Sequence, residues 1–195
     1  DAAPVVPERH FPVPSKQRET ALDDHLLNAQ EYIATKNRVA ALRAENPNGS
    51  ETADDLEALN VKPEQLPWHK PIQTWLKRKD FRNGLHLDPI TGRRVGSGWT
   101  VPVNETPVSD LSPETVSSFL MQNRDLMNKQ GYRLSIRKDG DGFKLQTVRH
   151  FRAGDRSQAI DLAHYTHANY ILDHSKAEPE TYLREWSDRS PVEEY

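Results

Sequence analysis

Histidines are the residues of this chain whose types and spacing come closest to a chemical site. His164 and His167 lie three residues apart in a segment predicted to be helical, and two imidazoles at that spacing can share a metal ion. His150, Asp173 and His174 become neighbours if the strands that carry them pack together. The chain lacks the general-base Glu of the His-Glu-x-x-His zinc motif. We therefore predict surface histidines, with no metal site and no catalytic residue among them.

The run from Asp139 to Gly142 has the alternating Asp and Gly residues that begin a calcium-binding loop. Such a loop needs oxygen ligands at alternating positions and a Glu at the twelfth. Here the fifth position is Phe143 and the twelfth is His150. Apolar and polar residues alternate on both sides of the run, so we predict the turn of a β-hairpin.

The sequence lacks the residues that other kinds of catalytic site require. The chain has no cysteine, which excludes disulfides, thiolate catalysis and cysteine-ligated zinc. It has no Gly-rich phosphate-binding loop and no Gly-x-Ser-x-Gly elbow. Every carboxylate lies in a polar sequence context, which gives no reason for a shifted pKa. We therefore predict a protein that is not an enzyme and binds no cofactor.

Composition favours a chain that is partly extended and lies on something else. Of its 195 residues, 35% are hydrophobic and 28% are charged, and 14 are prolines. The formal net charge is -3, and no segment is basic enough to predict nucleic-acid binding. No run of 18 apolar residues is present, so no membrane span is predicted.

The N-terminal part reads as an extended arm followed by helices. Four prolines predict that residues 1–15 are extended. Apolar residues at helical spacing predict one long helix over residues 16–45, and a short helix follows over residues 50–60 with Leu56 and Leu59 inward. We assign residues 16–80 to a helical region. The long helix has one narrow apolar stripe, which fits packing either on this chain or on a neighbouring one.

A cluster of large apolar residues lies near the end of the helical region: Trp68, Ile72, Trp75 and Leu76. Tryptophan is common at the centre of protein interfaces, so these four residues are the candidate partner-binding site. Aromatic residues also fill protein cores routinely, and we favour this second interpretation, in which the cluster covers the chain's own core.

The C-terminal part predicts an α+β domain over residues 81–176. Its expected elements are a strand that enters a tight turn at Asp88–Gly92, a strand over 99–103, and helices that begin at Ser112, Asn123 and Asp155. Gln158 lies three residues after Asp155, which is the spacing of a capping box. Alternation around the Asp-Gly turn predicts the hairpin, and residues 170–172 predict a last strand that joins the sheet after a crossover. Residues 177–195 form an acidic tail with a short helix around Tyr182–Trp186.

The stretch from Gly84 to about Glu180 resembles a small α+β domain of actinobacteriophage virion-associated proteins. The likeness lies in the order of several segments: Leu85 to Gly92, Gly96 to Val103, Leu111 to Thr115, Tyr132 to Ile136 with its Asp-Gly turn, Arg156 to Ala163, and Asn169 to Asp173. Arg149-His150-Phe151 stands where that domain has a small acidic segment. The resemblance implies a place in a phage virion and no established activity.

Three functions follow as hypotheses. The leading one is a structural component of a phage particle, either a minor capsid protein or a capsid-stabilising protein. Its expected partners are other protein subunits of the assembly, such as capsid protein. The second is an accessory subunit of a large cellular or organellar assembly. The third is a hydrolase or toxin that uses His150, His164 or His167, which requires a buried polar cluster.

Overall fold

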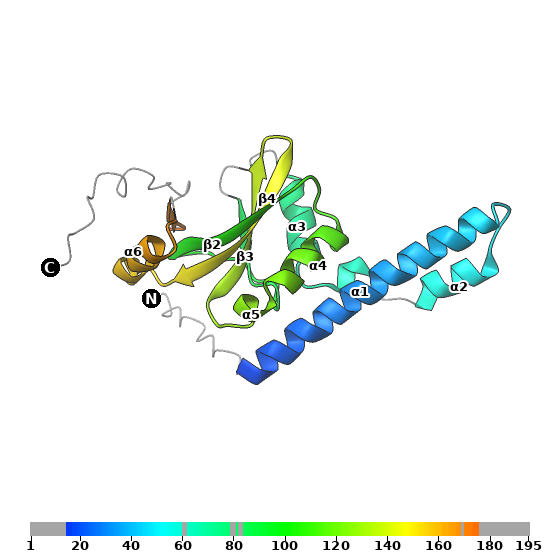
Figure 1. Ribbon diagram of the computed structural model, residues 1–195, viewed down its shortest axis with the longest axis horizontal. Helices are drawn as coiled ribbons and strands as arrows, with labels where there is room; N and C mark the ends of the chain where they lie inside the picture. The colour runs from blue at the N-terminus through cyan, green and yellow to red at the C-terminus, as the bar shows by residue number, and fades with distance from the viewer. Residues whose placement is uncertain (1–14, 60–61, 79–80, 82–83, 169, 176–195) are drawn as a thin grey trace, which may run out of the picture.

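The structure, a computed structural model, describes residues 15–59, 62–78, 81, 84–168 and 170–175. It combines helices with one antiparallel sheet, so the predicted α+β class is confirmed (Figure 1). The arm expected over residues 1–15 lies outside these ranges except for Ser15, which begins the first helix. The predicted acidic tail over 177–195 lies outside them entirely.

The helices follow the predicted order. Their bounds are α1 Ser15–Glu45, α2 Glu51–Leu59, the 3-10 turn η1 Pro63–Gln65, α3 His69–Leu76, α4 Pro113–Gln122, α5 Arg124–Met127 and α6 Arg156–Tyr165. The long first helix and the short second helix match the sequence prediction. Leu59 was expected inward, but it ends α2 and is 86% exposed, so that prediction is wrong. No helix in the described ranges has both the length and the apolar character that a membrane crossing requires.

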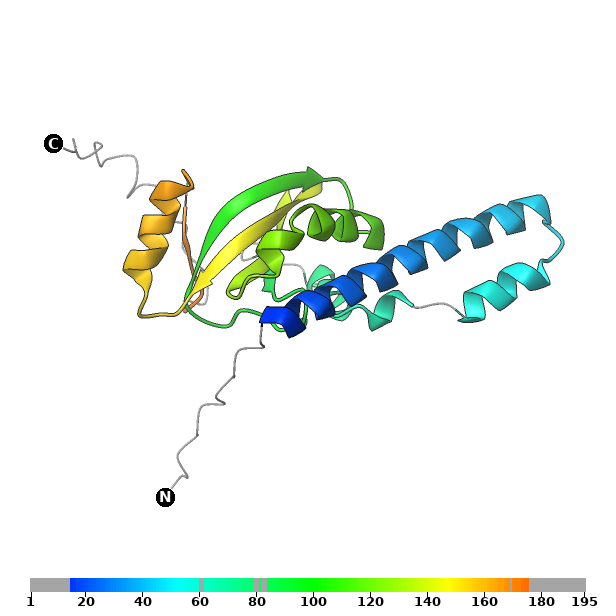
Figure 2. The same cartoon turned by 60° about the horizontal axis from the view of Figure 1, so that its bottom comes forward.

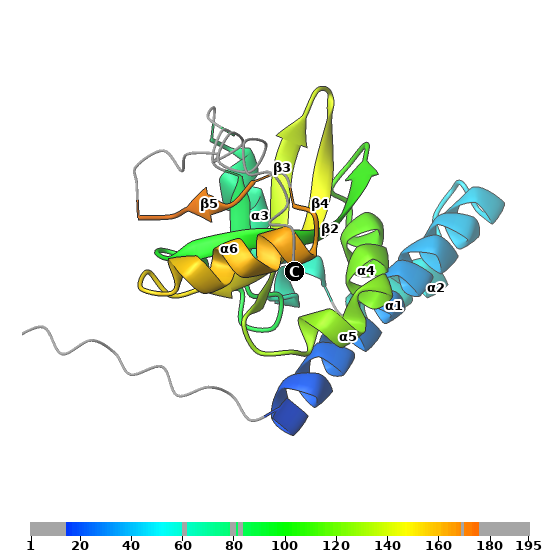
Figure 3. The same ribbon diagram turned by 60° about the vertical axis from the view of Figure 1, so that its left-hand side comes forward.

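Five antiparallel strands form the sheet in the order β1-β3-β4-β2-β5. Their bounds are β1 Leu85–Leu87, β2 Trp99–Val108, β3 Tyr132–Asp139, β4 Gly142–Phe151 and β5 Leu172–Asp173. The predicted hairpin is β3 and β4, which closes where Asp139 pairs with Gly142. The last strand joins the sheet edge beside β2 after α6, which confirms the predicted crossover, but it begins at Leu172 and not at residue 170 (Figure 3). β2 extends five residues beyond the predicted 99–103, with a register shift between Pro102 and Asn104.

Local side chains explain two of the predicted boundaries and fail to explain a third. The Ser112 hydroxyl accepts a hydrogen bond from the Thr115 amide and caps α4. The Asp88 carboxylate accepts from the Ile90 amide, and Gly92 has φ +68°, as a tight turn requires. Asp155 begins α6 without a side-chain cap, so the expected capping box there is absent.

The main core is shared between the helical region and the sheet. Buried side chains of α1, α3 and the segment before α3 pack with those of the sheet and of α4: Leu22, Leu26, Ala29, Leu66, Trp68, Ile72, Trp75, Leu85, Leu87, Val116, Phe119, Leu120, Leu134, Ile136 and Leu145. A smaller core forms where α6 packs against β2 and β4, around Trp99, Val101 and Ala163. The boundary predicted at residue 81 therefore does not separate two cores.

Ion pairs fix the first half of α1 to the rest of the chain. Arg18 is 4% exposed and donates two hydrogen bonds, at 2.9 and 3.0 Å, to the carboxylate of Asp88 in the turn after β1. A third bond from Arg18 reaches the carbonyl of Met127 at 3.2 Å. Asp23 binds Arg124 through a second, more exposed bidentate pair at 2.5 and 2.7 Å. The start of α1 is thus an integral part of the fold and not a separate arm.

Candidate functional site

The second half of α1 leaves the sheet and pairs with α2 in a helical hairpin, defined here as residues 34–59 (Figure 2). At 1.5 Å per residue, α1 is about 46 Å long, and only its first half lies over the main core. Among residues 34–59, all of which the structure describes, Val39 and Ala53 are the buried hydrophobic residues. The hairpin therefore projects from the body with little apolar packing of its own.

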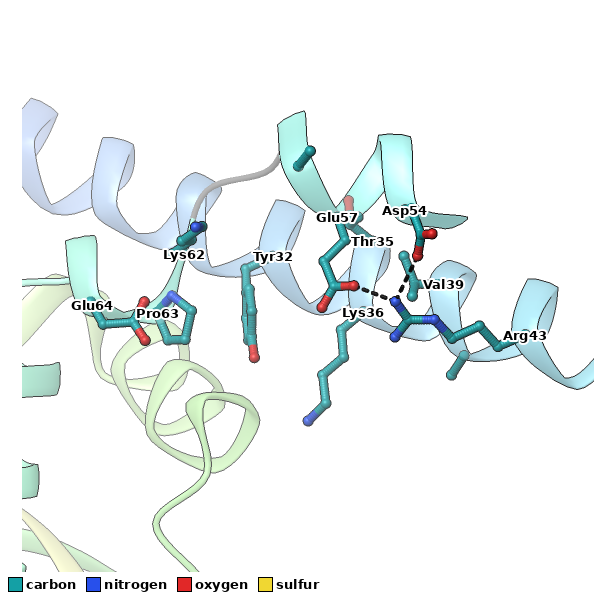
Figure 4. Close-up of a pocket in the computed structure, with 12 residues that line it drawn as sticks. Tyr32, Thr35, Lys36, Val39, Arg43, Asp54, Glu57, Lys62, Pro63 and Glu64 are labelled. Atoms are coloured by element: carbon teal, nitrogen blue, oxygen red, sulfur yellow. Dashed lines mark hydrogen bonds and ion pairs between the residues drawn. The ribbon is translucent and has the colours of Figure 1, made fainter. Parts of the chain in front are cut away.

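A groove of about 670 Å³ runs between the two helices of the hairpin and the segment that follows them (Figure 4). Its lining consists of Tyr32, Thr35, Lys36, Val39, Ala40, Arg43, Asp54, Glu57, Ala58, Lys62, Pro63 and Glu64. The Tyr32 ring, Val39, the two alanines and Pro63 give it an apolar strip. A groove of this size with an apolar strip and charged borders suits a protein segment as well as a small molecule.

Charges on the two helical walls of the groove are separated by sign. The α1 wall carries the cations Lys36 and Arg43, and the α2 wall carries the anions Asp54 and Glu57. Arg43 binds both acids across the groove, at 3.1 Å to Asp54 and 2.5 Å to Glu57. All three side chains are at least half exposed. These ion pairs therefore bridge the two helices but contribute little to the stability of the fold.

The predicted partner-binding residues Trp68, Ile72, Trp75 and Leu76 do not form an exposed site. Trp68, Ile72 and Trp75 are at most 3% exposed in the main core, and Leu76 packs against that core. The Trp75 ring meets Phe81 edge-on, with ring centres 5.0 Å apart. These side chains therefore belong to the chain's own core, which is the interpretation favoured from the sequence, and the candidate partner-binding site is wrong.

A polar cluster, in which His86 and Thr100 are buried and His150 and His174 are partly buried, lies where β5 joins the sheet. His174 Nε2 lies 2.8 Å from the hydroxyl of Thr100, and its ring meets that of His86 with centres 4.6 Å apart. His150, which pairs with Thr100 across the strands, donates from Nε2 to the carbonyl of Ser97 at 2.7 Å. The predicted proximity of His150 to the last strand is therefore confirmed.

Burial sets the protonation of this histidine cluster. It lowers the pKa of His174 to about 4; the nearby His150 adds to the effect and Asp173 opposes it. Burial also lowers the pKa of His150, against the hydrogen bond to Ser97. The rings of His150 and His174 are therefore neutral at pH 7, and the Thr100 hydroxyl beside His174 is fully buried.

The remaining histidine pair stands apart from this cluster. His164 lies near the end of α6 and His167 follows it, and both side chains are exposed. Within the described ranges, no three His, Cys, Asp or Glu side chains come together as a metal site would require.

Comparison with family models, with curated proteins and with solved structures finds no match to this chain.

Proposed function

We propose that this chain is a structural component of a phage particle, a minor capsid or capsid-stabilising protein that acts through protein–protein contacts. The observation that carries this proposal is the projecting hairpin. Two short helical segments with two buried hydrophobic residues are marginal in water, and contacts with another subunit supply the missing burial. The resemblance of residues 84–180 to a virion-associated domain supports the choice of a phage particle.

The hairpin also provides a surface that the rest of the fold does not occupy. Leu59 at its end is 86% exposed, and the groove beside it is open (Figure 4). The buried pair of Arg18 and Asp88 joins the other half of α1 to the body, and the exposed pair of Lys36 and Glu114, at 3.3 Å, joins the base of the hairpin to α4. A rigid base with a free helical extension is the geometry of a protein that docks on a neighbour.

The test is mass spectrometry of density-purified phage particles from a culture that carries the gene for this chain. We expect the chain to co-purify at a fixed ratio to the major capsid protein. Detection in the host fraction and absence from particles would overturn the proposal.

Two variants test whether the chain joins the particle through the groove of the hairpin. Ala40 and Ala41 are both exposed residues of α1, and only Ala40 lines the groove. We expect Ala40→Trp to be lost from particles and Ala41→Trp to be retained, since both keep the helix intact. Equal incorporation of the two variants would show that the groove is not the contact.

A further inference from the structure

Two short segments at one end of the sheet bring basic residues together. Residues 129–133 span the start of β3, and residues 149–156 run from the end of β4 to the start of α6. Together they contain five lysine and arginine residues and one acidic residue. The strands hold the segments side by side, because Tyr132 pairs with Arg149 and the His150 amide donates to the Gly131 carbonyl at 2.7 Å. This concentration of charge is a product of the fold, since neither segment alone is basic enough to predict nucleic-acid binding.

We define the basic patch as Lys129, Arg149, Arg152 and Arg156. Lys129 and Arg152 are exposed, and the two other side chains are partly exposed. Lys129, Arg149 and Arg152 make no ion pair within the residues that the structure describes. The patch therefore carries positive charge that no acidic side chain of the described chain neutralises.

A further cation beside the patch adds to this charge. The side chain of Arg133 is 22% exposed, and its ion pair with Asp88 is long, at 3.9 Å. Both oxygens of the Asp88 carboxylate already accept hydrogen bonds from Arg18. Burial lowers the pKa of Arg133 against the opposing effect of Asp88, and the charges of Arg18 and Arg149 lower it further. Arg133 and Arg149 are thus close enough for their charges to act together.

Aromatic rings hold two of the guanidinium groups of the patch in place. Arg149 lies over the rings of Tyr132 and Phe151, at 5.5 and 5.2 Å from the ring centres, and Arg156 lies 5.6 Å from that of Trp99. Arg149 also donates one hydrogen bond, at 3.0 Å, to the Gln130 carbonyl. A guanidinium has five N–H donors, so Arg149 keeps others for a ligand. A group that is already held loses less conformational freedom when it binds an oxyanion.

The chemistry of the patch favours phosphate groups over a protein surface. Protein interfaces have an apolar centre, but Arg149 lies over both aromatic rings of the patch surface. The strongly exposed large hydrophobic residues of the described ranges all lie outside the patch: Leu27, Leu59, Met121 and Tyr165. Interfaces with nucleic acids are instead polar and strongly positive, and arginine binds phosphate groups through two parallel hydrogen bonds.

We propose that the basic patch binds the phosphate backbone of a nucleic acid. The start of α6, which carries part of the patch, lies at the opposite end of the molecule from α2 (Figures 1 and 2), so the patch is separate from the groove. Contacts to phosphates carry no sequence information, and binding is therefore independent of base sequence. Three or four such contacts give weak binding, with a Kd on the order of tens of micromolar at low salt.

The experiment is fluorescence anisotropy of labelled DNA titrated with the full chain. The probes are a duplex of about 20 base pairs and one of its single strands, in about 50 and 100 mM salt. Each phosphate contact adds about −0.9 to the slope of log affinity against log salt on duplex DNA, so three or four contacts weaken binding about six- to twelvefold over this doubling. Both probes should bind, and the tighter one identifies the form of nucleic acid. No binding of either probe up to about 300 μM protein in the lower salt would refute the proposal.

Two charge-matched variants locate the contact. Lys129→Gln with Arg152→Gln removes two exposed cations of the patch, and Arg38→Gln with Lys70→Gln removes two exposed cations on α1 and α3. The two variants have the same net charge. We expect the patch variant to bind at least about tenfold more weakly, with a salt slope smaller by about 2, and the control to bind as the wild type does. An equal loss in both variants would mean that net charge, and not the patch, holds the DNA, and the proposal would fail.

A polyglutamate peptide is the competitor that tests for an acidic protein partner. It should displace the duplex less well than unlabelled DNA of the same charge, and equal or better displacement would assign the patch to a protein instead. The outcome is independent of the particle role proposed above. A chain that binds DNA through the patch but is absent from phage particles keeps the patch proposal and loses the other, and a particle component that binds no DNA does the reverse.

Discussion

The ion pair between Arg18 and Asp88 offers the sharpest test of how the N-terminal helix is joined to the sheet. Arg18→Met keeps most of the side-chain volume and removes the guanidinium. It leaves the carboxylate of Asp88, a residue only 6% exposed, with the Ile90 amide and with Arg133 at 3.9 Å. Removal of one partner from a buried pair costs about 3–5 kcal/mol, because the other charge stays buried and uncompensated. For a chain of this length that corresponds to a fall in Tm of roughly 6–20 °C.

Urea denaturation followed by tryptophan fluorescence is the assay, since Trp68 and Trp75 lie in the core beside α1. Arg124→Met is the matched control. It removes the bidentate pair between Arg124 of α5 and Asp23 of α1. The side chains of that pair are each 36% exposed, against 5% and 9% for Arg18 and Asp88. Exposed pairs contribute little to stability, so the control should remain close to wild type.

A double-mutant cycle with Asp88→Asn separates the ion pair from other effects. We expect the two substitutions together to cost less than their sum, with a coupling of about 1–3 kcal/mol. Equal and small effects of Arg18→Met and Arg124→Met would refute this reasoning. They would show that the start of α1 is not held by the buried pair.

Acid should weaken the same pair. Burial acts to raise the pKa of Asp88, but the hydrogen bonds from Arg18 and the charges of Arg133 and Arg18 outweigh it and hold the pKa below its ordinary value. The stabilisation is therefore present above the ordinary pKa of an aspartate and is lost as the pH falls through the lower, folded-state pKa. The difference between wild type and Arg18→Met should shrink accordingly.

Three further predictions address the rest of the fold. The folded-state pKa of His174, about 4, lies below the ordinary 6.5, so the free energy of unfolding should fall by up to roughly 3 kcal/mol between pH 6.5 and pH 4. His174→Gln should flatten that slope in urea titrations, and His164→Gln should not. Trp75→Ala should cost about 3–5 kcal/mol by the same assay, as for other buried large-to-small changes; a normally stable variant would contradict its core position. Gly92→Ala should cost more than about 1–2 kcal/mol, because φ is positive there and the new Cβ would lie 2.3 Å from the Pro67 carbonyl oxygen. At Gly154 an added Cβ would meet no atom within 4 Å outside its chain neighbours, so Gly154→Ala should leave the Tm unchanged in thermal melts.

Local signals predicted most of the elements. The apolar spacing of α1, the Ser112 cap, the turn at Asp88 and the alternation around the Asp139 turn are each set by residues close in sequence, and each appears as predicted. The errors at Leu59 and at the expected Asp155 capping box lie at helix ends, where a single side chain decides the geometry.

Long-range pairings could not be predicted in the same way. No residue close to Arg18 in the sequence shows that it meets Asp88, which lies 70 residues away. His86 lies on β1, Thr100 on β2 and His174 directly after β5. Since β1 and β5 stand at opposite ends of the strand order, only the three-dimensional fold brings these residues together. The groove depends on how α1, α2 and the segment after them pack together, which residues 34–45 and 51–59 do not show locally.

Hydrogen exchange of the hairpin amides tests the proposed docking role most directly. The exchange of residues 34–59 would be compared between the isolated chain at low concentration and the same chain in purified phage particles. We predict slow exchange of these amides in the particle and fast exchange in the isolated chain, with the shared core protected in both. Equal exchange of the hairpin in the two states, with new protection over another surface, would contradict the assignment of the hairpin as the contact.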